Sequence, residues 1–206
     1  MLTDVSTDEF TEITELTVLA PDHPRLLTIV TGACAAAGAN IAGAQISTTS
    51  TGLALDTVLV QREFDRADDE LRRARRIAEV IEGGLKGEMR VSDLVVRRAK
   101  PTKRQKAFSV EPVVLIDNGP SNLFTVIEVN GRDRTGLLFE LTSALSELSL
   151  NIGSARIATF GERVVDVFYV TDLTGQKIEN ANRQAAIRRR LLAVLVPDAT
   201  AQAAAE

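Results

Sequence analysis

Two stretches of the chain carry the same pattern of apolar and polar positions. In each, an alternating run is followed by a run with apolar residues three and four positions apart, and then by two more alternating runs. Alternation is typical of a half-buried strand, and the wider spacing of an amphipathic helix. A second run with helical spacing closes each stretch. The predicted elements span residues 13–20, 24–37, 41–48, 53–60 and 68–85, and then 123–130, 137–148, 152–159, 164–171 and 179–195.

The two stretches are an internal repeat with a shift of 111 residues. Matching residues include Val18 and Val129, Asp22 and Asp133, Leu26 and Leu137, Thr31 and Thr142, and Asn40 and Asn151; a one-residue slip then aligns Asp56 with Asp166. Such a repeat predicts two copies of one small domain. The length of 206 residues and the 45% apolar composition suit two domains of ordinary size.

The order strand, helix, strand, strand, helix, strand is ferredoxin-like, so the predicted fold class is α+β with two βαββαβ domains. Residues 89–97 are expected to be the fourth strand of the first domain. No strand follows the last helix of the second, so residues 109–117 are expected to fill its edge position, where Pro112 is tolerated. The predicted division is a disordered lead-in (1–12), a first domain (13–98), a basic linker (99–108), a second domain (109–196) and a disordered tail (197–206).

Composition narrows the function classes. The net charge of −4 argues against a nucleic-acid-binding chain, and the basic segment 97–106 is most simply a solvated linker. No apolar run is long enough to span a membrane, and the acidic N-terminus does not resemble a secretory signal. The single cysteine, Cys34, excludes an internal disulfide, so we expect a cytoplasmic protein.

Candidate ligand-contacting residues lie where the first helix of each repeat begins and where the next strand begins. A helix start offers unpaired N–H groups to a carboxylate, and asparagine offers both a donor and an acceptor. We expect the loop and the asparagine of one repeat to form one site, and the glycine loop of the second repeat is the stronger candidate. Ordinary turn and capping chemistry is the alternative. The candidates are Asp22, His23, Arg25, Leu26, Asn40 and Ile41, and then Asp133, Arg134, Thr135, Gly136, Leu137, Asn151 and Ile152.

No catalytic or metal site is predicted. His23 is the only histidine, which argues against a multi-histidine metal centre. Gly153-Ser154 followed by Asp166 superficially suggests a nucleotidyltransferase, but Phe168 stands where a second metal carboxylate is needed.

Several sequence blocks resemble a known family. Residues 133–138, Asp-x-x-Gly-Leu-Leu, with Asn151-Ile152, resemble the core of ACT domains, small regulatory domains that bind amino acids. PDHPRLL (21–27), GACAAAGANI (32–41), GLALDT (52–57) and GERVVDVFYVTDLTGQKI (161–178) are similar to the C-terminal ACT pair of bifunctional PII uridylyltransferase/uridylyl-removing enzymes. The resemblance covers residues 13–196. Arg25 replaces the usual ACT glycine, as is typical of the first ACT domain of that family.

The resemblance implies a regulatory region of nitrogen metabolism rather than an enzyme. In that family the ACT pair senses L-glutamine and shifts the balance between uridylylation and removal of uridylyl groups on the PII protein. The implied partners are glutamine, the catalytic domains and, indirectly, PII. Magnesium and UTP belong to a nucleotidyltransferase domain that this sequence lacks, and no cofactor is implied for this chain. The sequence thus resembles a fragment or a short gene product.

Three points stay open at this stage. The chain could instead be a stand-alone tandem ACT module that binds an amino acid or a protein. The number of ligand sites, one or two, is not decided. ACT–ACT pairing could occur within one chain or between two chains.

Overall fold

The computed structural model describes residues 2–8, 10–98 and 110–196. The strands of this part are β1 (Leu2–Asp8), β2 (Ile13–Pro21), β3 (Ile41–Thr48), β4 (Leu53–Gln61), β5 (Val113–Asp117), β6 (Thr125–Arg132), β7 (Leu150–Phe160) and β8 (Arg163–Asp172). Its helices are α1 (Leu26–Ala37), α2 (Ala67–Leu85), α3 (Val91–Arg98), α4 (Leu137–Glu147) and α5 (Ala181–Leu195). The ten elements predicted from the two repeated patterns are therefore present.

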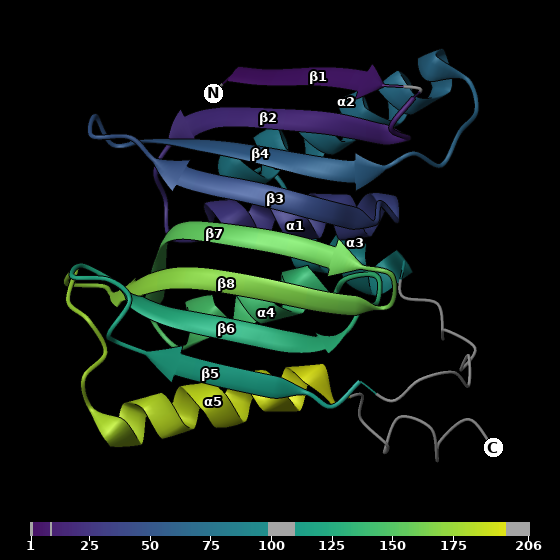
Figure 1. The fold of residues 1–206 in the computed structure, drawn as a ribbon. Coiled ribbons are helices and arrows are strands. Elements are labelled where there is room, and N and C mark those ends of the chain that lie inside the picture. Colours follow the sequence, from purple (N-terminus) through teal and green to yellow (C-terminus); the bar gives the residue numbers. More distant parts are fainter. Residues whose placement is uncertain (1, 9, 99–109, 197–206) are drawn as a thin grey trace.

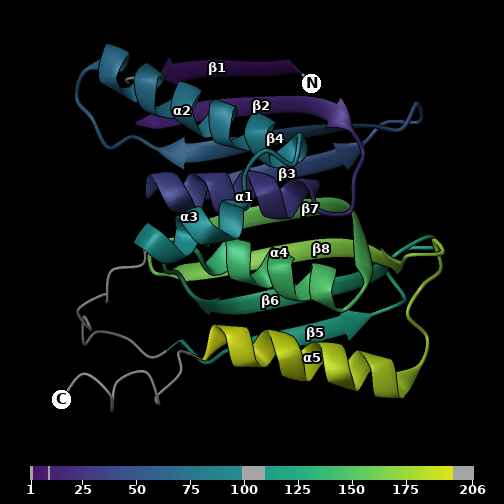
Figure 2. The same cartoon turned by 180° about the vertical axis from the view of Figure 1, so that it is seen from behind.

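The molecule has two layers, one sheet and one layer of helices (Figures 1 and 2). The strands form a single antiparallel sheet in the order β1-β2-β4-β3-β7-β8-β6-β5. The helices cover one face, and the alternate residues that point toward them form the core, for example Val18, Val58 and Phe168, each 0% exposed. This confirms the α+β, ferredoxin-like class.

The two repeats pair with each other within the chain. We call residues 2–98 the first repeat and 110–196 the second. Strands β3 and β7 meet antiparallel, with Gln45 opposite Arg156, its counterpart in the repeat. Behind them the hydroxyls of the counterparts Thr31 and Thr142 hydrogen-bond at 3.1 Å. Equivalent residues that meet each other define an approximate two-fold axis, as in a symmetric dimer.

The topology of the first repeat differs from the prediction. Residues 2–8 are not disordered: they form β1, which pairs along β2 from Leu2 opposite Leu19 to Asp8 opposite Ile13. In the second repeat β5 pairs with β6, as predicted for residues 109–117. Both repeats therefore take their edge strand from the segment before them. Most side chains of β1 are exposed, so this strand lacked the apolar alternation that predicts strands.

Residues 89–97 are likewise not a strand, because α3 occupies most of this segment. Its partly or fully buried residues are Val91, Leu94 and Val95, which have the spacing of a helix face. The helix packs on α1 at Gly32, where a Cβ atom would lie 2.6 Å from Val91 Cγ1. The β-branched valines of this segment favoured a strand locally, and packing on α1 overrode that preference.

Two predicted segments, the basic linker 99–108 and the tail 197–206, lie outside the described residues. The domain boundaries stay a prediction. Within the described part of the chain, no helix combines the length and apolarity needed to cross a membrane.

Candidate functional site

A narrow pocket lies where the two repeats meet on the helix-covered side of the sheet. Its cavity volume is about 30 Å³, and the empty space around it, which includes open solvent, is about 400 Å³. Its walls come from α1 and the start of β3 in the first repeat, and from the loop before α4 and strands β7 and β8 in the second. The lining residues are Thr31, Ala35, Ala39, Asn40, Ile41, Asp133, Arg134, Gly136, Leu137, Leu138, Phe139, Ile157, Thr159, Val164 and Asp166.

The loop between β6 and α4 forms one side of the pocket. It is anchored to the β7–β8 hairpin, because the Asp133 N–H donates to the Glu162 carbonyl at 2.8 Å. Gly136 has φ 85°, a conformation that favours glycine. No side chain of the described residues caps the α4 N-terminus. The pocket therefore borders a helix start whose N–H groups favour an anionic ligand group.

Asn40 reaches the same pocket from the first repeat. Its Nδ2 donates to Gln61 Oε1 at 2.9 Å, and the Gln61 N–H donates to the Asn40 carbonyl, also at 2.9 Å. Its side chain also lies close enough to Asp133 of the second repeat to lower the pKa of that carboxyl. This contact joins the two repeats at the pocket.

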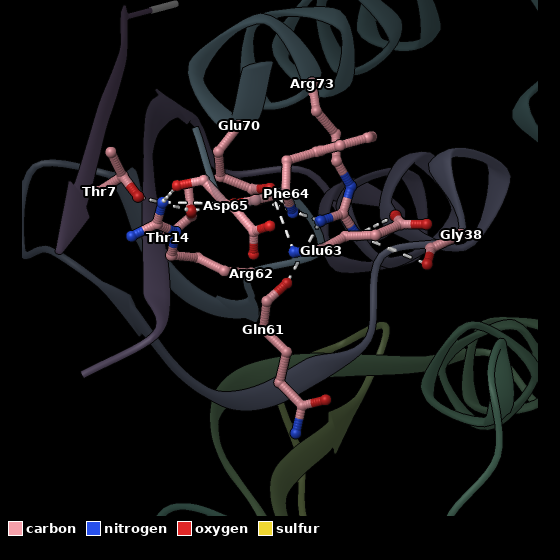
Figure 3. A network of polar contacts seen from close by, with 10 residues as sticks. All are labelled: Thr7, Thr14, Gly38, Gln61, Arg62, Glu63, Phe64, Asp65, Glu70 and Arg73. Carbon is pink, nitrogen blue, oxygen red and sulfur yellow. Dashed lines mark hydrogen bonds and ion pairs between the residues drawn. The ribbon is translucent and has the colours of Figure 1, made fainter. Parts of the chain in front are cut away.

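A polar network centred on Glu70 and Arg73 (Figure 3) includes Gln61, the hydrogen-bond partner of Asn40. Glu70 is 1% exposed, forms an ion pair with Arg73 at 3.0 Å, and accepts from the Thr14 hydroxyl at 3.2 Å. Arg73 donates to the Gln61 carbonyl at 3.2 Å and to the Gly38 carbonyl at 3.5 Å. The network thus ties α2 to Gly38, two residues before Asn40, and to Gln61, which hydrogen-bonds Asn40.

Asp166 is the most unusual residue of the pocket wall. It is 1% exposed, and its Oδ1 has no hydrogen-bond partner among the described residues. Burial raises its pKa to about 7; the Ala158 N–H lowers it and the charge of Asp133 adds to the rise. Burial likewise raises the pKa of Asp133. The pocket wall therefore holds two carboxyl groups, those of Asp133 and Asp166. No cation of the described residues pairs with Asp166.

The first repeat has a counterpart of this pair. Asp56 is 1% exposed, neither of its carboxylate oxygens has a partner in the described chain, and burial followed by the charge of Asp22 raises its pKa to about 7. The loop beside it differs. Its residues 22–25 are exposed, and the Arg25 N–H already donates to His23 Nδ1 at 3.1 Å. A ligand at this loop would compete with that internal contact.

The structure groups the predicted residues differently from the sequence. Asn40 and Ile41 join Asp133, Arg134, Gly136 and Leu137 of the other repeat in the pocket wall. Thr135 is exposed, and Asn151, Ile152, Asp22, His23, Arg25 and Leu26 do not line this pocket.

Antiparallel pairing of β3 with β7 explains why Asn40 of the first repeat lies beside the loop of the second. It places the start of β3 beside the end of β7, where the Thr159 hydroxyl donates to the Ile41 carbonyl at 3.3 Å. Strand β7 leads into the hairpin that holds Asp133. The start of each inner strand therefore lies next to the loop of the opposite repeat.

Sequence reasoning missed the pocket residues Thr31, Thr159 and Asp166. All three carried a signal, because Thr31, Thr159 and Asp166 match Thr142, Thr48 and Asp56 in the repeat. An aspartate between valines in an apolar strand is a further signal. Burying a charge there is costly, so such a residue is a candidate for a functional role.

One known protein family matches part of the chain. Residues 121–195 match the model for the ACR family N-terminal ACT domain. This region is an ACT domain. The first repeat has the same strand and helix order, so the chain holds two ferredoxin-like repeats, the second of which contains the matched region.

Two solved structures are similar to the chain. Aspartate kinase from Synechocystis is 15% identical, with a TM-score of 0.46, over 86% of this chain and 26% of the kinase chain. This chain therefore spans about a quarter of the length of that kinase. An unknown protein from Galdieria sulphuraria is 15% identical, with a TM-score of 0.29, over 89% of this chain and 91% of the other.

Proposed function

We propose that this chain is an amino-acid-sensing regulatory region, and that its ligand binds in the pocket between the two ACT repeats. The observation that carries the proposal is the composition of that pocket. A helix start suits a carboxylate, the acidic groups suit an amine, and Asn40 and two threonine hydroxyls suit a polar side chain. These groups complement a free amino acid better than a sugar, a nucleotide or a metal ion.

Glutamine is the proposed ligand. The sequence blocks similar to uridylyltransferase/uridylyl-removing enzymes favour it, and the neutral hydrogen-bonding groups of Asn40, Thr31 and Thr159 suit its side-chain amide. The region would then report glutamine to the catalytic domains of a larger enzyme, and through them to PII. A tandem ACT module for another amino acid is the alternative.

The regulatory step follows from the position of the pocket. A ligand that touches Asn40 of one repeat and Gly136 of the other stabilises the arrangement in which the two lie together. It can shift a conformational equilibrium only as far as it binds that arrangement more tightly than others. Any catalytic domain that contacts both repeats would experience this shift.

Titration calorimetry with each of the twenty amino acids tests the proposal. Glutamine is expected to bind, and Asn40→Ala should weaken binding roughly 10-fold, as expected for one lost hydrogen bond to a polar ligand. The counterpart variant Asn151→Ala locates the site. Equal losses in both variants would indicate two sites, and a loss only in Asn151→Ala would move the site to the other loop. If a folded chain binds none of the amino acids, the proposed function is wrong.

A further inference from the structure

Asp166 has a structural setting that folding alone does not explain. Its carboxylate is buried in the pocket wall, the nearby backbone N–H of Ala158 lowers its pKa, and Oδ1 has no partner in the described chain. Leaving a buried polar atom unpaired costs roughly 1–3 kcal/mol, more if it is charged. Such a group in a pocket is a candidate for contact with a ligand.

Among the described residues, no cation is free to pair with Asp166. The charged side chains that line the pocket are Asp166, Asp133 and Arg134. Arg134 is engaged elsewhere, because its guanidinium pairs with both oxygens of Glu140 at 2.5 and 2.6 Å and donates to the Val194 carbonyl at 3.1 Å.

Apart from Asp133, Arg134 and Asp166, the side chains that line the pocket are neutral. Helix α1 contributes Thr31 and Ala35, and strand β7 contributes Ile157 and Thr159. Helix α4 and the start of β3 contribute apolar side chains and the neutral amide of Asn40. Asp133 is therefore the titratable group that acts on Asp166, and it is another acid.

A small cation is the ligand group that this arrangement lacks. An ammonium group near Asp133 and Asp166 would supply the missing donor to Oδ1 and offset the repulsion between the two acids. The α4 N-terminus on the same pocket favours the carboxylate of the same molecule. A zwitterion with adjacent amine and carboxylate meets both requirements.

We propose that Asp166 binds the α-ammonium group of the amino acid, and that ligand binding drives its proton into solvent. This inference rests on the proposed function. In the balanced step, the neutral Asp166 carboxylic acid and the ammonium ligand give an ion pair of carboxylate and ammonium, and one proton passes to the buffer. No bond of the ligand is broken.

The coupling has a definite sign. Only the ionised form of Asp166 pairs with the ammonium group, so affinity rises with pH until Asp166 is ionised in the empty pocket. With a pKa of about 7 for the empty pocket, affinity should rise on the order of 20-fold from pH 5.5 to pH 7.5. Asp133 contributes in the same direction, because burial raises its pKa as well.

Calorimetry with L-glutamine tests the inference on the whole chain. At pH 6.5, the apparent binding enthalpy should depend on the ionisation enthalpy of the buffer, with the sign of proton release. Asp166→Asn should remove most of this dependence and weaken binding at least tenfold. The matched control is Asp56→Asn, which changes an equally buried aspartate outside the pocket and should retain both properties.

A second probe needs no variant. The des-amino analogue of glutamine, 4-carbamoylbutyrate, should bind the unchanged chain at least tenfold more weakly than glutamine and without proton release. Equal affinity for both compounds, or glutamine binding whose enthalpy is the same in all buffers, would overturn the role of Asp166 while leaving the proposed function intact. A chain that binds no amino acid at all would refute both.

Discussion

Replacing Asp56 with asparagine should flatten the dependence of stability on pH. Asp56 is 1% exposed and its carboxylate oxygens have no partner in the described chain. Burial, with the charge of Asp22, raises its pKa from 3.8 to about 7. The folded state therefore holds this proton more tightly than the unfolded state does.

The sign and size of the effect follow from linkage. For an acid whose pKa is higher in the folded state, stability is complete below the unfolded pKa and falls as the pH rises toward the folded pKa. At 1.36 kcal/mol per pKa unit, the full loss is roughly 4 kcal/mol for this one group, of which about 3 kcal/mol falls between pH 4 and pH 7. Asp166 adds a loss of the same sign, so the variant should remove about half of the combined effect.

Urea unfolding at pH 4.5, 6 and 8, followed by circular dichroism, measures this difference. The unfolding free energies of the wild-type chain and Asp56→Asn should diverge in favour of the variant as the pH rises. Any packing cost of the asparagine is the same at each pH and cancels from the slope. The exposed Asp4→Asn on β1 is the control and should leave the slope unchanged. Parallel pH curves for wild type and Asp56→Asn would refute the reasoning.

Three further predictions concern the backbone, the buried network and the edge strand. Gly136→Ala should cost roughly 1 kcal/mol of stability because of its positive φ, and should weaken ligand binding in calorimetry, whereas Gly161→Ala, at φ 62° in open space, should cost stability alone. Arg73→Met leaves Glu70 buried without its counter-charge, so thermal and urea unfolding should show a loss of roughly 3–5 kcal/mol; adding Glu70→Gln should restore part of it, and no restoration would contradict this account. Removal of residues 1–8 takes away β1 and should lower the unfolding free energy by roughly 2 kcal/mol in urea titrations, since Val5 packs on the core; an unchanged value would show that β1 adds no stability.

The local pattern of apolar residues was sufficient to predict an element wherever buried side chains recur at a regular spacing. Strands such as β4, with buried Ala54, Val58 and Val60 on one face, alternate along the sequence and were predicted correctly. The exposed strand β1 has no such period, so its pairing with β2 could not be read locally. The valines near α3 illustrate the opposite error, where intrinsic preference favoured a strand and tertiary packing formed a helix.

The residues of the candidate site were likewise predictable only in part from the sequence. The helix-start loop with Gly136 and the asparagine at position 40 are marked by residue type and by the repeat, so the sequence alone singled them out. Their partnership was not predictable, because it depends on which strands meet at the centre of the sheet. The burial of Asp166 also depends on that pairing.

The sequence by itself determined that this protein is built from two copies of one ferredoxin-like unit, since repeat spacing and apolar period are local properties of the chain. Only the tertiary structure decided that β3 pairs with β7, that Asn40 of one repeat meets Asp133 of the other, and that Asp166 is enclosed without a partner. The physical reason is that strand pairing across 111 residues is chosen by the packing of whole surfaces. No local run of side chains specifies it.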